Sequence, residues 1–503
     1  MTPPRYFTDA STMNRIVNRL LVAAAVAATL PVLAGAQGAA PTTQPVAISL
    51  GDALRMAARV SHSVRAADAG VLRARGQQAQ ARSQYFPQLA ATAGYQRTLQ
   101  SQFQEISKRD APTGGTSGSS DSSGTDGFGS IGKIFASPVT ETVTLNFSQS
   151  LFTAGRLASA NAAAGAARTA AEIGLDAARA QASLDVAQAY YDAVAARRVA
   201  EIADSTLAQA ERSLEHTSLA YEVGSASEFD FLRARVARDN QKPVVIQSRG
   251  NSEIAMLRLR QLLGISLAQP IALTTTIRDE GVAAAPAATA DRPIEVPGTD
   301  RAIMPDTSVS GRSSVRQAVA SVDAQRAALR AANWQRLPSV QVTSTYQRFG
   351  YPSDGALFPN SLGLFYPNWT MTAGFSFPIF TGGRISGDRM VAEANLTEAE
   401  ESLAQAREYA ALDARTAVVQ LAQAQAAYAA SVGTDEQAAR AYGIAEVRQQ
   451  EGISTQVELQ QARTQYEQAR LNRVVAAKDL EIARLRVALL KDLPLGTTPA
   501  GRR

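Results

Sequence analysis

The side chains that could do chemistry are few, and their spacing favours no catalytic or metal site. The chain has no cysteine, so it has no disulfide, no thiolate metal site and no thiol nucleophile. Its two histidines, His62 and His216, lie far apart in sequence on helical stretches, where an ordinary surface position is the simpler interpretation. No nucleophile–base pair or phosphate-binding loop is visible, because the glycines mark turns. We therefore expect no enzyme activity, no metal and no cofactor.

The charge pattern limits the partners. The 503 residues include 50 Lys and Arg and 45 Asp and Glu, which gives a formal net charge of +5. Basic and acidic residues alternate along helical stretches, which is typical of solvated helix faces and not of a nucleic-acid-binding patch. We expect no nucleic-acid partner.

The first residues have the features of a secretory signal, which we assign to residues 1–36. Arg15 and Arg19 precede an uncharged apolar run over residues 20–33, and Ala34-Gly-Ala36 is typical of a cleavage site. The run is shorter than the roughly 20 residues that a membrane-spanning helix needs. We expect the mature chain to leave the cytoplasm.

The rest of the chain uses one structural unit twice. The unit begins with an alternating run at Thr142–Phe152, continues through a Gly-Arg corner and ends with a long Ala-rich stretch up to Gly224. The same three features recur 228 residues later: the alternating run at Thr370–Phe380, then a second Gly-Arg corner, then a long stretch that ends at Gly452. A repeat of this length indicates one supersecondary unit present in two copies. The sequence predicts a first repeat at 47–266, a linker or equatorial segment at 267–312, a second repeat at 313–492, and a C-terminal tail at 493–503.

Each repeat is expected to contain two strands of about ten residues between long helices. In the clearest strand Val143, Leu145 and Phe147 share one face, and polar residues occupy the other. This length and alternation suit a tilted strand that crosses a bilayer with lipid on one side and water on the other. Four strands cannot close a barrel, because even small barrels use about eight, and an open edge is not tolerated in lipid. The alternatives are a barrel shared between chains and a soluble four-stranded sheet.

Helical periodicity covers most of the remaining residues. One helix is expected from Ser49, with a capping box at Asp52, to Phe86, and the loop between the strands of the second repeat is expected at 348–368. The stretch 156–223 reads as one helix, followed by a return helix to Leu263 that Pro243 could disturb. Its apolar residues recur at alternating steps of four and three, which indicates a packed helix seam. The seam consists of Ile173, Ala177, Ala180, Leu184, Ala187, Tyr191 and Val194.

These features together resemble the TolC-like outer-membrane efflux proteins over residues 47–492. The resemblance rests on the duplicated plan, on the Phe-x-x-Gly-Arg corners at 152–156 and 380–384, on the Tyr-x-Val-Gly-x-x-Ser turn at 221–227, and on the Leu-Leu-Gly at 262–264. It implies a mainly α chain with a membrane β-barrel, built from a duplicated strand–long helical hairpin repeat. A homotrimer would form a 12-stranded β-barrel in the outer-membrane lipid, continued by a 12-helix periplasmic α-barrel. The implied partners are a periplasmic adaptor (membrane fusion) protein and an inner-membrane pump.

The resemblance also implies functional residues at the periplasmic tip, where two helix turns meet. The residues implied in tip formation and adaptor docking are Gly224, Ser225, Ser227, Gly452, Ile453 and Ser454. The implied pore constriction is formed by Asp230 and Glu458, for which a solvated helix face is the alternative interpretation. The family's latch arginine is replaced by Ser454, so a closed state held by that latch is not expected.

Three functions are compatible with this pattern. The first is an outer-membrane exit duct of a tripartite efflux system for small molecules such as drugs or toxic compounds. The second is the duct of a type I protein secretion system, which uses the same fold. The third is a structural coiled-coil stalk, which the alternating strand segments argue against.

Overall fold

The computed structural model describes residues 45–99, 139–277, 294–295, 302–303, 308–350 and 366–496. The chain divides into two compact units, of which the larger comprises Ala47–Leu267 with Ala272–Arg503. Of the smaller unit, Met1–Val46 with Ala268–Ile271, only residues 45–46 and 268–271 are described. The predicted signal at residues 1–36 lies outside the described residues, as do most of the linker and the end of the tail.

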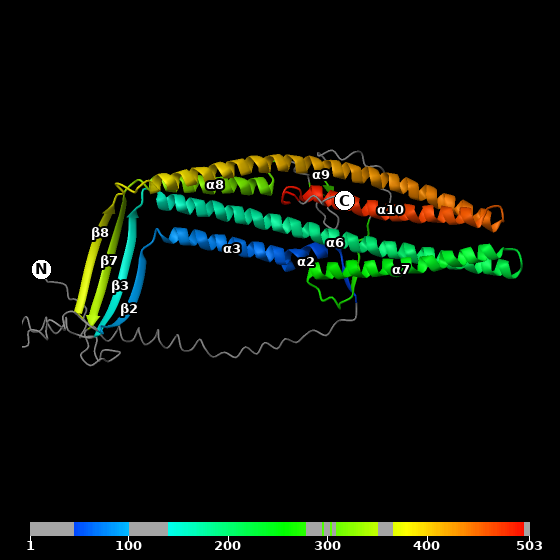
Figure 1. Cartoon of the computed structure of the whole chain (residues 1–503), viewed down its shortest axis with the longest axis horizontal. Helices are drawn as coiled ribbons and strands as arrows, with labels where there is room; N and C mark the ends of the chain where they lie inside the picture. The colour runs from blue at the N-terminus through cyan, green and yellow to red at the C-terminus, as the bar shows by residue number, and fades with distance from the viewer. Residues whose placement is uncertain are drawn as a thin grey trace, which may run out of the picture. The chain divides into compact units, whose positions relative to one another are not determined.

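The first repeat contains four helices and two long strands (Figure 1). They are α2 (Leu50–Val60), α3 (His62–Ser83), β2 (Gln88–Arg97), β3 (Val139–Phe152), α6 (Arg156–Glu222) and α7 (Glu228–Leu263). The second repeat has one helix before its strands. Its elements are α8 (Ser313–Trp334), β7 (Ser339–Gly350), β8 (Tyr366–Ser376), α9 (Arg384–Gln450) and α10 (Gln456–Leu489). Four short strands complete the described elements: β1 (Val46–Ile48), β4 (Ile271–Leu273), β5 (Ile294–Glu295) and β6 (Ala302–Ile303).

The equivalent long helices have equal lengths. α6 and α9 contain 67 residues each, which at a rise of about 1.5 Å per residue is about 100 Å. Each continues through a tight turn into a return helix, so that α6 pairs with α7 and α9 with α10 (Figure 1). The duplication predicted from the sequence is therefore present as two long helical hairpins.

The four long strands form one antiparallel sheet in the order β2-β3-β7-β8. The strands lie side by side at the end of the unit from which the long helices extend (Figure 1). β2 and β8 each have a single neighbour in this sheet, so both edges of the described sheet are open. The predicted count of two long strands per repeat is confirmed.

Three local expectations are wrong. The single helix expected from Ser49 to Phe86 is interrupted at Ser61, whose backbone is extended (φ −53°, ψ 125°) between α2 and α3. The strand expected to end at Phe380 ends at Ser376, because Pro378 has no N–H to continue the ladder. The loop expected at 348–368 is shorter, because β7 continues to Gly350 and β8 begins at Tyr366.

Other local expectations are confirmed. Ser49 and Asp52 form the expected capping box at the start of α2. The return helix α7 reaches Leu263 as expected, and Pro243 lies inside it without ending it. The seam residues of α6 are buried, apart from the half-buried Ala177. The middle of α6 is buried on more than this stripe, and Tyr190 beside the seam is fully covered.

The second repeat contains a buried ionic cluster. Arg312, at the N-cap of α8, donates through Nη2 to Asp413 of α9 at 2.5 Å, and Arg486 of α10 donates to the same carboxylate at 3.2 Å. The side chains of Arg312 and Asp413 are 0% and 8% exposed. A carboxylate shared by two guanidinium groups joins three helices at one point, and losing the carboxylate would leave buried charge without compensation.

Candidate functional site

The pairing register sorts the strand residues onto two chemically distinct faces. One face is mostly apolar: Leu89, Ala91, Ala93, Val143, Leu145, Phe147, Val340, Val342, Tyr346, Trp369, Met371, Ala373 and Phe375. The opposite face is polar and uncharged: Gln88, Thr92, Gln96, Thr142, Thr144, Asn146, Ser148, Gln341, Thr343, Thr345, Gln347, Asn368, Thr370, Thr372 and Ser376. Thr345 donates to Asn146 across this polar face at 2.9 Å. The alternation expected for one strand therefore holds over most of the described sheet. The exceptions include Gln149 and Ser344 on the apolar face and Phe349 and Tyr366 on the polar face.

The charged residues of these four strands all lie on the apolar face. They are Arg97, Glu141 and Arg348, and each is close to the strand end that is far from the helices. The rest of the apolar face in the described strands is free of charge. This distribution is the one expected of a lipid-facing surface with charged groups at its rim.

The two helix turns have the same backbone geometry. Gly224 and Gly452 have φ values of 76° and 70°, the left-handed conformation that glycine adopts without strain. In the first turn the N–H of Ser225 donates to the carbonyl of Ala220 at 2.8 Å. In the second, the N–H of Ile453 donates to that of Arg448 at 2.9 Å. Glycine therefore occupies the position after each helix C-cap, where its left-handed backbone lets the following N–H donate to a carbonyl of the last helical turn.

The acidic residues Asp230 and Glu458 lie in the first turns of the return helices. Ser227, the N-cap of α7, accepts a hydrogen bond from the N–H of Asp230 at 3.1 Å, and its hydroxyl donates to the Asp230 carboxylate at 2.6 Å. In α10 the hydroxyl of Ser454 donates to the Glu458 carboxylate at 2.6 Å. Asp230 is half-buried and Glu458 is exposed in the single chain. The N–H of each acid is capped by the hydroxyl of Ser227 or Thr455, and each carboxylate accepts from a serine, which is compatible with a second role at a pore.

A cluster above the second turn was not anticipated from the sequence. The rings of Tyr442 on α9 and Tyr466 on α10 stack at 5.8 Å, and Tyr442 donates to Glu446 at 3.2 Å. Arg463 lies beside them with 6% exposure. Burial lowers the pKa of Arg463, while the nearby Glu467 opposes that shift. Burial together with the Glu446 carboxylate raises the pKa of Tyr442.

Polar contacts join the two hairpins along their length. Nearest the tip, Gln456 of α10 donates to Ser213 of α6 at 3.0 Å. Farther along, Gln241 of α7 donates to Glu467 of α10 at 3.3 Å. Lys478 of α10 then pairs with Asp192 of α6 at 3.2 Å. Single-sequence periodicity does not reveal these contacts, because each partner belongs to the other repeat.

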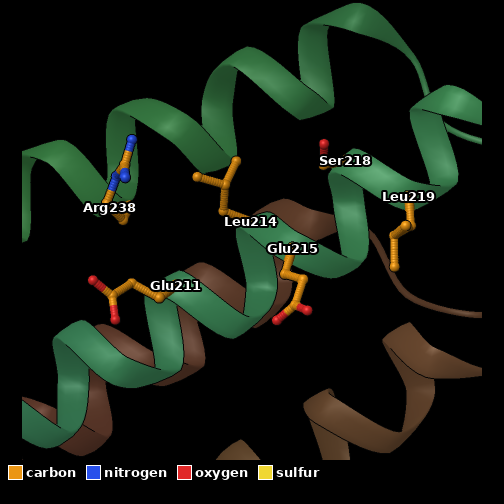
Figure 2. A pocket seen from close by; sticks show the side chains of 6 residues that line it. All are labelled: Glu211, Leu214, Glu215, Ser218, Leu219 and Arg238. Carbon is orange, nitrogen blue, oxygen red and sulfur yellow. The ribbon is translucent and has the colours of Figure 1, made fainter.

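A shallow groove of about 400 Å³ runs beside the first turn, between α6 and α7. Figure 2 shows one wall formed by five side chains of α6 and the other by Arg238 of α7. The α6 residues are Glu211, Leu214, Glu215, Ser218 and Leu219. The groove combines two carboxylates with two leucines, which suits contact with another helix better than chemistry on a small molecule.

The described residues offer neither a metal-binding cluster nor a membrane-spanning helix. Within the described ranges, no three His, Asp or Glu side chains gather closely enough to hold a metal ion. Among the helices of the described ranges, none has a stretch long and apolar enough to cross a membrane.

Comparison with known proteins identifies the family. The family model described as "Outer membrane efflux protein" matches residues 53–265 and 304–490. The toluene efflux pump outer membrane protein TtgF of Pseudomonas putida is 29% identical over 225 residues. The probable efflux pump outer membrane protein SepC, from another strain of P. putida, matches equally well. Each match covers 44% of this chain and 42% of the relative, so it spans about two fifths of the relatives' length.

Solved structures share the fold. The Campylobacter jejuni CmeC outer membrane channel has a TM-score of 0.67 at 17% identity, covering 88% of this chain and 86% of that one. The open state of the Neisseria gonorrhoeae MtrE outer membrane channel has a TM-score of 0.64 at 19% identity, covering 88% of each chain. These two outer membrane channels therefore share the fold of this chain. The chain is therefore an outer-membrane protein and belongs to the outer membrane efflux protein family.

Proposed function

We propose that three copies of this chain form a channel that crosses the outer membrane and continues into the periplasm. The observation that carries the proposal is the four-stranded sheet, which has two open edges and one apolar and one polar face. In lipid such edges must be paired, and three copies supply twelve strands. The same three copies supply twelve long helices from α6, α7, α9 and α10 for a periplasmic barrel.

The channel is proposed to export small molecules. The polar face of the described strands becomes the water-filled lumen, and its threonine, serine, asparagine and glutamine side chains carry no charge. Such a lining admits solutes of either charge and does not select one ligand. The name of the relative TtgF, a toluene efflux pump protein, supports efflux of small toxic compounds. No contact in the described residues favours protein secretion instead.

The tip is proposed to dock a periplasmic adaptor protein that connects the channel to an inner-membrane pump. Gly224 and Gly452 shape the turns, and large apolar side chains near them are exposed without a partner in the chain's own core. These include Val223 at 79%, Phe229 at 69% and Ile453 at 69% exposure. Ser225, Ser227 and Ser454 add hydroxyl groups at the same turns.

Asp230 and Glu458 are proposed to line the constriction at this tip. Threefold symmetry turns each acid into a ring of three carboxylates, so up to six negative charges face a narrow water path. Such a ring concentrates cations and repels anions, strongly at low salt and weakly at high salt. The hydrogen bonds from Ser227 and Ser454 hold the carboxylates at the start of their helices.

Native mass spectrometry in a gentle detergent, followed by planar-bilayer recording of the same sample, tests this proposal. We expect a trimer and discrete, cation-selective conductance steps. A monomer that leaves the bilayer silent would overturn the proposed assembly. A trimer that conducts without cation preference would support the proposed channel but contradict the proposed constriction by Asp230 and Glu458.

A further inference from the structure

An arginine whose side chain is held by its neighbours lies on the apolar strand face, near the strand end that is far from the helices. Arg348 is on β7, opposite Val143 of β3 in the sheet register. Its Nε donates to the hydroxyl of Tyr346 at 2.8 Å, and its guanidinium lies 5.8 Å from the centre of that ring. The orientation of the guanidinium is therefore fixed by its own strand.

Aromatic neighbours hold Tyr346 in turn. Trp369 of β8 meets Tyr346 edge-on, with ring centres 6.5 Å apart, and donates through Nε1 to Ser344 at 2.9 Å. Tyrosine and tryptophan at such a position are typical of the interface between hydrocarbon and head groups. Arg348 therefore lies on the same face as the Tyr346–Trp369 pair, one pair farther from the helices.

The height of Arg348 on the sheet matches that interface. Arg348 lies nine residues after Ser339, where β7 begins at the helix end. At about 3.4 Å per residue this is about 30 Å along the strand. A tilt of roughly 40° reduces the distance to about 23 Å along the membrane normal, close to the roughly 25 Å apolar band of outer-membrane barrels.

The charges near Arg348 leave an anion as the fitting partner. Glu141 is one row farther out on the same face and 7% exposed, and its Oε1 is buried without a hydrogen-bond partner among the described residues, so it forms no ion pair with the half-buried Arg348. Arg97 lies on the same face of β2, opposite Val139, and is exposed. Arginine binds phosphate through two parallel N–H donors, a geometry that lysine cannot reproduce.

We propose that Arg348, oriented by Tyr346 beside Trp369, binds a phosphate group on a lipid of the outer leaflet. This inference rests on the proposed function, because the strand ends far from the helices face the cell surface only if the helices are periplasmic. The site anchors the rim of the barrel at a defined depth and gives the protein a preference for phosphorylated lipid.

Native mass spectrometry of the detergent-solubilised full chain tests the inference, with diphosphoryl lipid A and its dephosphorylated form as probes. The wild type should bind the phosphorylated form about tenfold more tightly, as expected for a charge-assisted hydrogen-bonded pair. Arg348→Gln should abolish the preference, and Arg348→Lys should retain only part of it. Arg330→Gln, an exposed position on α8 outside the sheet, is the matched control and should behave as the wild type.

The outcomes distinguish a wrong phosphate site from a wrong trimeric assembly. If Arg348→Gln keeps the wild-type preference in trimers, the phosphate site is wrong and the channel proposal stands. If the Gln variant fails to assemble, the Lys variant decides, since an unchanged preference in that variant also contradicts bidentate binding. A monomer in every spectrum overturns the proposed assembly itself.

Discussion

Substituting Gly452 with alanine isolates the backbone strain of the second tip turn. Gly452 has φ of 70°, and a Cβ added there meets no heavy atom within 4 Å. The substitution therefore creates no clash, and its whole effect comes from placing an L-residue in the left-handed region. The cost of that conformation is about 1–2 kcal/mol.

This cost should appear as local opening of the turn. The N–H groups of Ile453 and Ser454 both donate to the carbonyl of Arg448, at 2.9 and 3.2 Å, and the left-handed glycine makes these bonds possible. A loss of 1–2 kcal/mol corresponds to an increase of about 5- to 30-fold in the population of the open turn. Amide hydrogen exchange at these two positions should accelerate by the same factor.

Hydrogen-exchange mass spectrometry of the purified protein measures this effect, with Gly443→Ala as the matched control. Gly443 lies inside α9 with no atom near an added Cβ, and alanine should stabilise a helix interior by about 0.5–1 kcal/mol. The two substitutions add the same methyl group and should have opposite signs. Exchange at the turn that stays at the wild-type rate in Gly452→Ala would refute the reasoning, as would equal acceleration in both variants.

Three further predictions concern charge and capping. Replacing Asp230 and Glu458 together with Asn and Gln should shift the reversal potential under a KCl gradient towards zero; an unchanged potential would make both acids a solvated helix face. Asp413→Ala should lower stability by about 3–5 kcal/mol, because it leaves Arg312 buried without a counter-charge, and a thermal midpoint equal to that of the wild type would contradict this. Ser227→Ala removes an N-cap and should cost about 1 kcal/mol, visible as faster amide exchange in the first turn of α7 and absent if the cap contributes nothing.

Local periodicity was sufficient to predict most of the architecture. Alternation identifies β3, heptad steps identify the buried side of α6, and the constant offset of 228 residues shows that Gly452 is the equivalent of Gly224. These features depend on near neighbours in the chain, so one sequence contains them. The carboxylates Asp230 and Glu458 were found only through the family resemblance, and their role at a pore stays a prediction.

The features that the sequence did not reveal depend on contacts between distant segments. The stacking of Tyr442 on Tyr466 and the burial of Arg463 need two helices in a particular rotation, which periodicity alone does not define. The sequence predicts a loop that begins at Arg348. In the structure β7 extends through Arg348, because this residue pairs with Val143 of β3. The end of β8 at Ser376 instead of Phe380 could have been predicted from the sequence, because Pro378 has no N–H for the strand ladder.

Disulfide cross-linking between the two open sheet edges tests the central claim most directly. The chain has no cysteine, so every disulfide reports an introduced pair. Thr92→Cys on β2 is combined, one variant at a time, with cysteine at every second residue of β8 from Asn368 to Ser376, all on the polar face. This spacing samples the register at about 7 Å intervals, fine enough for one pair to reach disulfide distance. Oxidation in membranes should give covalent dimers and trimers and nothing larger from at least one pair, while no cross-link from any pair, or a ladder beyond three chains, would contradict a closed barrel of three copies.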